Sequence, residues 1–549
     1  MTRKLWWLSV IFIFRLPVGA QDLDTAWVRF YNGFENREDV ATALAVDGDG
    51  NVYVTGSTED SNNKENYLTI KYSREGNIEW ASEYDGPEYG VDFPVAIAVS
   101  DSGFVYVTGS SYSGPDNYDI VTIKYHSDGD TAWVRRYAYP GNSNDWARAL
   151  VVDKDGFVYL TGSIKSGKIL LTIKYEPDGD TAWTRTYYNS PLGNNIGYDI
   201  ATDNDGHIFV TGCRANSYTD IDIVTLKYTT SGCLLWTKAY NGPGNYYDWA
   251  EAIAVDDDGY VYVTGASEGD ETNMDYVTIK YAPDGDSEWV RRYSGGGEDS
   301  PDKSCALALD DEGNVFITGY SRGNMTGFDY LTIKYNAVGD TAWTRRYNGP
   351  DNLTDWPCDI DVDRYGNVVV AGESYSQLSD ADFMLIMYDT EGTLRWLEKF
   401  NGPGNGEDDL AALALDNDGN IYVTGLSDGV GSDCDFATIK YSPVLTDVDE
   451  LISDILPEEY TLNQNYPNPF NPATNIEYTV ASRSYINLAV YNILGQEIKI
   501  LVDGIRSIGT YRAVWDGTDQ NGRLVATGIY FYRLQTGTTV KSKKMLLLR

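Results

Sequence analysis

The sequence predicts an all-β protein: an eight-bladed β-propeller with four-stranded blades, in which the N-terminal strand closes the last blade, followed by a small Ig-like β-sandwich. Three observations predict this fold. A segment like GNVYVTG recurs eight times, and a tryptophan recurs with the same spacing of 50 to 54 residues. The composition, with 44 Tyr, 14 Trp and 54 Gly, is typical of turn-rich β-structure.

Each repeat is expected to form four short strands. In the first repeat, small and branched residues alternate over 41–46, and Asp and Gly at 47–50 predict a tight turn into a strand over 51–55. A polar loop leads to a third strand over 67–72, and a turn at Gly76 leads to a fourth over 77–84, which carries Trp80. Four strands in a repeat of this length are typical of a propeller blade.

The phase of the repeats predicts how the ring closes. Residues 24–31 resemble a fourth strand with no preceding three, and the last repeat supplies three strands and stops at Tyr441. The first strand of the chain should therefore complete the last blade, which removes open sheet edges. The pattern D-x-D-G-N-V-Y-V-T-G, then D-Y-x-T-I-K-Y, then Trp, resembles the SBBP-type β-propeller repeat over residues 24–441. The resemblance implies a fold and no single activity.

The two ends of the chain predict export. Arg3 and Lys4 precede an apolar run over 5–14, and small residues at 18–20 suit a cleavage site, so residues 1–20 are expected to be a signal peptide. No later stretch approaches about 18 apolar residues, so we expect no transmembrane span. This places the propeller at 21–445, an acidic linker at 446–459 and a C-terminal domain at 460–549.

The C-terminal domain carries a distinctive set of motifs. NYPNPFNP at 465–472, WDGTDQNGR at 515–523 and ATGIYFY at 526–532 occur in order before a basic and apolar terminus. These segments closely resemble the type A C-terminal sorting domain of the type IX secretion system, which is related in fold to the Ig-like domain of flagellar hook-capping proteins. The resemblance implies that residues 460–549 contact the secretion machinery, and that the protein is released or anchored at the cell surface.

Charge and cysteine content exclude some functions. With 42 Lys and Arg against 82 Asp and Glu, the formal net charge is −40, so nucleic acid is a poor candidate partner. Five scattered cysteines are too few for a disulfide scaffold, and Cys305 and Cys358, at one position of neighbouring repeats, are expected to be small buried residues. The Asp-Gly turns lack the length and distal Glu of a calcium loop.

Aspartates repeat at two other positions. The first set opens the first strand of each repeat, where Asn195 replaces one member, and these aspartates could ring a central channel and bind calcium: Asp39, Asp92, Asp145, Asp248, Asp302, Asp355 and Asp408. A second set opens the third strand: Asn66, Asp119, Ile169, Asp222, Asp275, Asp329, Asp382 and Asp435. The alternative is structural, with each carboxylate accepting from loop amides or a neighbouring Lys, Thr or Trp.

One repeat departs from this pattern. The loop between its second and third strands is the shortest of those compared and contains Lys165 and Lys168, Ile169 replaces an aspartate, and Asn195 follows. This combination predicts a basic notch for an anionic sugar or a partner carboxylate, with sequence drift as the alternative. The loops on this side differ between repeats, whereas the turns on the other side scarcely change, so ligand binding is expected on the variable side.

The chain offers few of the usual catalytic groups. His126 and His207 lie in or beside turns, away from any G-x-S-x-G or HExxH motif. The lysines that repeat in the third strand are expected to pack along the sheet or to pair with the aspartate sets. The sequence therefore favours a secreted or surface-bound, non-catalytic binding or adhesion scaffold for an unknown glycan or protein. The alternative is an extracytoplasmic enzyme that acts on polysaccharide, as a lyase or glycosidase.

Overall fold

The computed structural model describes residues 23–33, 37–114, 117–190, 193–217, 220–269, 273–295, 301–323, 326–377, 379–431, 433–443, 450–453, 460–480, 484–506, 509–520, 523–536 and 540–548. All regular elements in these ranges are strands. Contacts divide the chain into two units, one formed by Asp24–Ser442 and one that contains Pro443–Arg549. The predicted signal peptide and most of the predicted linker lie outside the described residues.

The first unit contains eight four-stranded antiparallel sheets, whose strands we call first to fourth. The first strands are β2 (Asp39–Val46), β6 (Asp92–Val99), β10 (Trp146–Val152), β14 (Asn195–Thr202), β18 (Asp248–Val255), β22 (Asp302–Leu309), β26 (Asp355–Val362) and β30 (Asp408–Leu415). The second strands are β3 (Val52–Glu59), β7 (Val105–Gly114), β11 (Val158–Ile164), β15 (Ile208–Ala215), β19 (Val261–Glu268), β23 (Val315–Arg322), β27 (Val368–Tyr375) and β31 (Ile421–Asp428).

The third and fourth strands complete each sheet. The third strands are β4 (Glu65–Tyr72), β8 (Asn117–Tyr125), β12 (Ile169–Tyr175), β16 (Ile221–Tyr228), β20 (Met274–Tyr281), β24 (Phe328–Tyr335), β28 (Ala381–Tyr388) and β32 (Cys434–Pro443). The fourth strands are β5 (Ile78–Tyr84), β9 (Thr131–Tyr137), β13 (Thr181–Tyr187), β17 (Leu234–Tyr240), β21 (Ser287–Tyr293), β25 (Thr341–Tyr347), β29 (Leu394–Phe400) and, from the start of the chain, β1 (Leu23–Tyr31).

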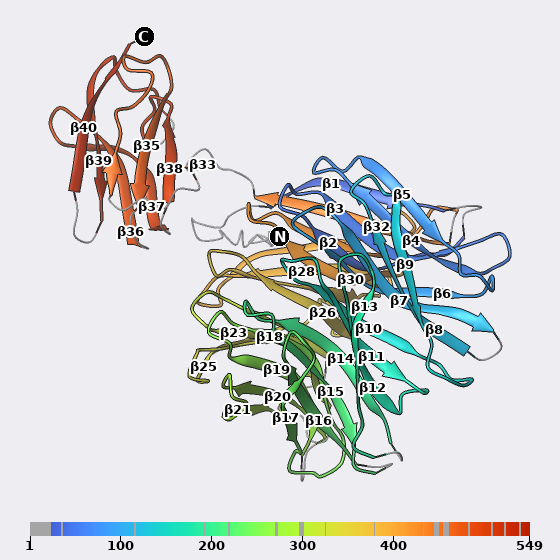
Figure 1. Ribbon diagram of the computed structural model, residues 1–549. Coiled ribbons are helices and arrows are strands. Elements are labelled where there is room, and N and C mark those ends of the chain that lie inside the picture. The colour runs from blue at the N-terminus through green and yellow to red at the C-terminus, as the bar shows by residue number, and fades with distance from the viewer. Residues whose placement is uncertain are drawn as a thin grey trace, which may run out of the picture. The chain divides into compact units, whose positions relative to one another are not determined.

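The sheets form a closed ring (Figure 1). Each first strand contacts the first strand of the next sheet, and β30 of the last sheet contacts β2 of the first. The last sheet has the order β1-β32-β31-β30, so the first described strand of the chain pairs with the third strand of the last repeat, as the phase of the repeats predicts. The prediction of an all-β propeller is confirmed.

Small residues explain why the repeat motif is so regular. In the first sheet, the Asp47 carboxylate accepts hydrogen bonds from the amides of Asp49 and Asn51, at 3.0 and 2.9 Å, and Gly50 has a φ of 80°. This turn needs a residue that tolerates the left-handed region. Gly56, at the end of the VTG motif, lies so close to β2 that an added Cβ would sit 2.0 Å from the Val40 carbonyl oxygen.

Hydrogen bonds between neighbouring sheets account for the repeated tryptophan and lysine. Trp183 Nε1 and Lys174 Nζ both donate to the Thr230 carbonyl of the next sheet, at 3.1 and 3.3 Å. At the ring closure, Trp27 of β1 and Lys440 of β32 both donate to the Arg74 carbonyl, at 3.1 and 3.4 Å. Residues from both ends of the propeller sequence thus hold the same turn of the first sheet.

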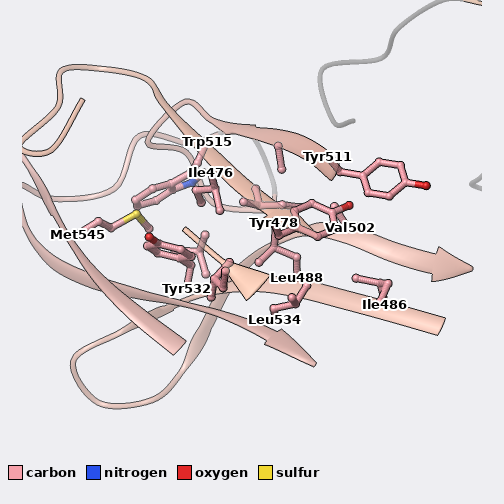
Figure 2. Packing of buried hydrophobic residues seen from close by; sticks show 14 of the residues in the cluster. Ile476, Tyr478, Ile486, Leu488, Val502, Tyr511, Trp515, Tyr532, Leu534 and Met545 are labelled. Atoms are coloured by element: carbon pink, nitrogen blue, oxygen red, sulfur yellow. The ribbon is translucent and has the colours of Figure 1, made fainter. Parts of the chain in front are cut away.

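The second unit is a β-sandwich. One sheet has the order β33 (Glu450–Ser453), β38 (Gly509–Trp515), β35 (Thr474–Val480) and β34 (Thr461–Leu462). The other has the order β37 (Glu497–Arg506), β36 (Ser484–Asn492), β39 (Gly528–Gln535) and β40 (Val540–Leu547). Figure 2 shows the buried side chains between them, which include Ile476 and Trp515 from the first sheet and Leu488, Tyr532 and Met545 from the second. An Ig-like relationship of this unit stays a prediction.

Candidate functional site

The loops of the propeller lie on two faces. We call the face with the connections from second to third strands and from fourth to first strands the loop face, and the opposite one the turn face. The first aspartate set lies at the loop face, but every member is 0–1% exposed: Asp39, Asp92, Asp145, Asp248, Asp302, Asp355 and Asp408. Each accepts a hydrogen bond from a backbone amide six or seven residues earlier, such as Gly242 N to Asp248 at 2.6 Å.

These aspartates hold the connections between sheets. Several also accept from the end of the second strand of their own sheet or from the loop after it, as Asp92 does from Tyr112 N of β7 at 3.0 Å. Burial raises the pKa of Asp92 and Asp248 above the ordinary aspartate value, and the hydrogen bonds oppose this rise. The described residues contain no group of three or more His, Cys, Asp or Glu side chains arranged for a metal ion. Calcium binding at this set stays a prediction.

Four of the six aspartates in the second set form ion pairs with the fourth strand of the same sheet. Arg136 pairs with Asp119 at 3.2 Å, and Arg292 pairs with Asp275 at 2.7 Å. Arg346 pairs with Asp329 at 2.9 Å, and Lys399 pairs with Asp382. Contrary to one expectation, six of the seven third-strand lysines point to the turn face and bind carbonyls of the next sheet, away from both aspartate sets. The seventh, Lys71, pairs with Glu79 at 2.8 Å.

The fourth sheet reaches the same charge balance by another route. Its fourth strand has Ala239 in place of the arginine, and Arg214 of the second strand pairs with Asp222 at 2.8 Å instead. In the third sheet, Ile169 and Thr186 replace the aspartate and the arginine together. A buried carboxylate without a cation is costly, so both members of the pair change in the same repeat.

The predicted basic notch is a tight and well-anchored turn. Residues 165–168, which we call the lysine turn, place Lys165, Ser166 and Gly167 at φ values of 55, 56 and 82°. Lys165 N donates to the Asp145 carboxylate at 3.1 Å, and Ser166 N donates to the Asn144 carbonyl at 2.8 Å. The side chain of Lys165 is exposed, and that of Lys168 is partly exposed and donates to Asn194 Oδ1 at 3.4 Å.

Asn195 holds this turn in place through hydrogen bonds from its side-chain amide. It is 0% exposed, so it presents no side chain to a ligand. Its Nδ2 donates to the carbonyls of Lys168, Ser190 and Gly193, at 2.9, 3.2 and 3.4 Å. A carboxylate has no donor for these bonds, which explains why this repeat carries Asn where the others carry Asp.

Aromatic rings that the sequence analysis did not single out gather beside the lysine turn. Tyr118 stacks on Trp146 with ring centroids 5.0 Å apart and planes at 24°, and the Phe93 ring lies 6.0 Å from that of Tyr118. Tyr112 meets Tyr118 edge-on at 5.8 Å. All four side chains are partly exposed. We call these four residues the aromatic row. In the sequence, the signal for it was that Phe93 and Trp146 each directly follow an aspartate of the first set.

A second aromatic cluster lies on the loop face of the sixth and seventh sheets. Tyr320 meets Trp356 edge-on at 4.4 Å, and Phe328 lies 5.1 Å from Trp356. The sixth sheet also borders a pocket of about 370 Å³. Its lining includes Arg322, Thr326 and Asn348, together with Tyr293 of the fifth sheet.

A pair of carboxylates adjoins this cluster. Glu373 is the strand partner of Trp356, and its carboxyl group interacts with that of Asp409 in the next sheet. Burial, and then the charge of Asp409, raise the pKa of Glu373 well above its usual range. A carboxyl group with a raised pKa keeps its proton at a higher pH than an ordinary glutamate, and a general acid must hold such a proton. Neither residue belongs to a repeated motif, so the sequence offered no signal for the pair.

The histidines and cysteines lie away from these groups or differ from expectation. His207 pairs with Asp203 at 2.8 Å on the turn face, and His126 packs on the ring of Phe104. Cys305 and Cys358 are partly exposed rather than buried, because each is the extra residue of a β-bulge in its first strand. Cys305 Sγ donates to the Pro357 carbonyl at 3.1 Å.

Comparisons with known families agree with this architecture. Residues 31–62 match the SBBP β-propeller repeat, and residues 464–548 match the secretion system C-terminal sorting domain. The chain is a β-propeller protein that contains an SBBP repeat. It carries a type IX C-terminal sorting domain, which marks it for export to the cell surface or the extracellular space. No helix among the described residues is long and apolar enough to cross a membrane.

Solved structures give weaker likenesses. A fungal alcohol oxidase of the AA5 family in complex with copper is 14% identical, with 82% of this chain and 96% of that chain covered and a TM-score of 0.37. PorZ, a surface component of the type IX secretion system of Porphyromonas gingivalis, is 12% identical, with 93% and 81% covered and a TM-score of 0.27. An α-L-arabinofuranosidase of Fusarium graminearum is 12% identical, with 53% and 91% covered and a TM-score of 0.36.

None of these likenesses bears on the function of this chain, because each TM-score is below 0.5. No curated protein matches the chain.

Proposed function

We propose that this exported propeller is a non-catalytic binding scaffold that recognises extracellular glycans through its loop face. The observation that carries the proposal is the gathering of partly exposed aromatic side chains at this face, in the aromatic row and around Trp356. Rigid aromatic faces offer large contact areas at low entropic cost, and few soluble surfaces expose such rings in groups.

The contrast between the two faces supports the same proposal. On the turn face, aspartate, glycine, tryptophan and lysine repeat in role from sheet to sheet and form the hydrogen bonds that join the sheets. On the loop face, each sheet carries a different set of loop residues. A rigid ring with variable loops is a common arrangement for binding sites. A protein partner is the alternative ligand on this face.

A second candidate function rests on Glu373 and Asp409. The raised pKa of Glu373, beside a second carboxylate and next to Trp356, supports hydrolysis of a polysaccharide with Glu373 as the proton donor. The two functions differ in turnover, so one experiment separates them.

The test is a glycan array probed with the full chain, in millimolar calcium and in chelator, with an assay for cleavage of every bound glycan. Binding without cleavage is the expected result. Cleavage that Glu373→Gln abolishes would replace the scaffold by the enzyme, and binding of no glycan would contradict both.

Calcium should also raise the melting temperature if the aspartate set binds it, and identical melting curves in calcium and chelator would contradict calcium binding.

A further inference from the structure

We propose that the aromatic row and the lysine turn together form a binding site for a glycan that carries an acidic sugar, with a carboxylate or sulfate group. The proposal rests on the proposed function, since it names the class of glycan for that same face. In this site, sugar rings lie against Tyr118 and Trp146, and the acidic group pairs with Lys165. Three features of the molecule together support this site: a connection between the rings and the lysines, the local charge, and the rigidity of the lysine turn.

The first feature is a direct connection between the rings and the lysines. The Tyr118 carbonyl accepts a hydrogen bond from Asp145 N at 2.8 Å, and Asp145 directly precedes Trp146. The Asp145 carboxylate accepts in turn from Lys165 N at 3.1 Å. One buried aspartate therefore fixes the stacked rings and the lysine turn relative to each other.

The second feature is the local sign of charge. In the described loop-face residues of the third sheet, 139–148, 163–170, 187–190 and 193–198, Asp145 is the sole acid, and it is 0% exposed. The same residues include Lys165, Lys168 and Arg148, of which Lys165 and Arg148 are exposed. In a chain with a net charge of −40, this reversal of sign is confined to the third sheet, since Asp85 and Glu88 are exposed at the loop face of the second.

The surrounding charge limits the kind of anion. Charges farther than about 8 Å are largely screened at physiological ionic strength, so a single acidic group next to Lys165 is attracted. A densely charged polymer would extend from this patch over the acidic remainder of the surface and be repelled. An isolated acidic sugar in an otherwise neutral glycan fits both conditions, and a nucleic acid does not.

The third feature is rigidity. The lysine turn is bound on one side by Asn144 and Asp145 and on the other by Asn195, whose amide contacts the Lys168 carbonyl at 2.9 Å. Lys165 and Ser166 adopt left-handed backbone conformations, which non-glycine residues seldom do without compensation. A turn held in this way loses little entropy when a ligand binds.

The test compares acidic glycans with their neutral parents on the full chain by calorimetry. The probes are sialyllactose with lactose, cellobiouronic acid with cellobiose, and sulfated galactose with galactose. At least one acidic probe should bind about tenfold more tightly than its parent, and this advantage should fall as NaCl is raised from 50 to 500 mM. The pair that shows the advantage distinguishes carboxylate from sulfate.

Two substitutions locate the site. Lys165→Glu should remove the acidic advantage, about tenfold in Kd, and leave the affinity for the neutral parent unchanged. The matched control is Lys154→Glu, an exposed lysine on the turn face of the same sheet. Trp146→Leu should weaken acidic and neutral probes alike, with the melting temperature recorded to confirm folding.

The outcomes separate the two proposals. If array glycans bind but no acidic probe exceeds its neutral parent, or if Lys165→Glu binds the acidic probe as the wild type does, this inference is wrong and the proposed function stands. If no glycan binds in the array or in calorimetry, the proposed function fails, and this inference with it.

Discussion

At the scale of single residues, hydrogen-bond polarity decides which side chain opens each first strand. Asp92 and Asp248 accept from amides of loops, so a carboxylate with only acceptor atoms suits them. Asn195 meets three carbonyls and must donate. The third connection therefore carries Asn in place of Asp because the side chain faces carbonyl groups there. The bonds it donates hold the lysine turn rigid.

Asn195→Asp should destabilise the propeller by about 1–3 kcal/mol, because the new carboxylate leaves buried carbonyls unsatisfied and faces them with like partial charge. Urea denaturation of the full chain measures the loss. The control is Asn194→Asp, which makes the same change in charge on an exposed neighbour and should leave the midpoint unchanged. Equal effects of both substitutions would contradict this account of Asn195.

At the scale of the strand, β1 closes the ring although no loop joins it directly to the other strands of its sheet, which come from the far end of the propeller sequence. Its Trp27 is 7% exposed, packs between Tyr72 and Tyr422 at 6.0 and 6.4 Å, and donates to the Arg74 carbonyl. Trp183 occupies the corresponding place in the third sheet and is 8% exposed. The two tryptophans make equivalent contacts in different sheets, but only Trp27 lies in the closing strand.

Trp27→Ala and Trp183→Ala should each cost roughly 3–5 kcal/mol, the usual range for a large buried ring. Only Trp27→Ala should also release β1, since that strand can leave the sheet while the rest of the chain stays connected. Limited proteolysis followed by mass spectrometry of the N-terminal fragments detects this release. Rapid cleavage near β1 in the Trp183→Ala variant as well would contradict the prediction that only the loss of Trp27 releases this strand.

At the scale of the whole molecule, the ring contains carboxylates that are held between neighbouring first strands. Asp199 accepts from Ile253 N at 2.9 Å, and Asp359 accepts from Leu413 N at 2.9 Å. Burial raises the pKa of Asp199 and Asp361 to about 6 and that of Asp359 to about 7, from an ordinary value of 3.8. The folded state therefore binds protons more tightly than the unfolded state.

This sign predicts that the propeller becomes more stable as the pH falls. The stabilising contribution of these groups is complete below pH 3.8 and is lost as the pH rises through 6 and 7. The melting temperature of the full chain, measured in 0.5 M NaCl to screen surface charges, should be several degrees higher at pH 5.5 than at pH 8. Asp359→Asn should reduce this difference, and the exposed control Asp101→Asn should not. A melting temperature that rises with pH would contradict the prediction.

The sequence by itself determined the architecture, because the repeat is a local pattern. The VTG glycine, the tryptophan and the glycine of the turn between the first two strands recur in every sheet. Their spacing is enough to predict four strands, a ring and the closing strand. The sorting domain was predictable for a similar reason, since its motifs are contiguous. The loop that carries Lys165 and Lys168 also stood out in the sequence as a departure from an otherwise regular pattern, and ligand binding there stays a prediction.

The tertiary structure alone decided what the side chains of the loop face do. The sequence left open whether the first aspartates bind a cation or accept from loop amides. The structure buries them against backbone amides, because the connection between two sheets folds back over them. The aromatic row and the pair of Glu373 and Asp409 each combine residues from neighbouring sheets. Contacts of that kind arise from the packing of one sheet on the next, and the period of a single repeat does not encode them.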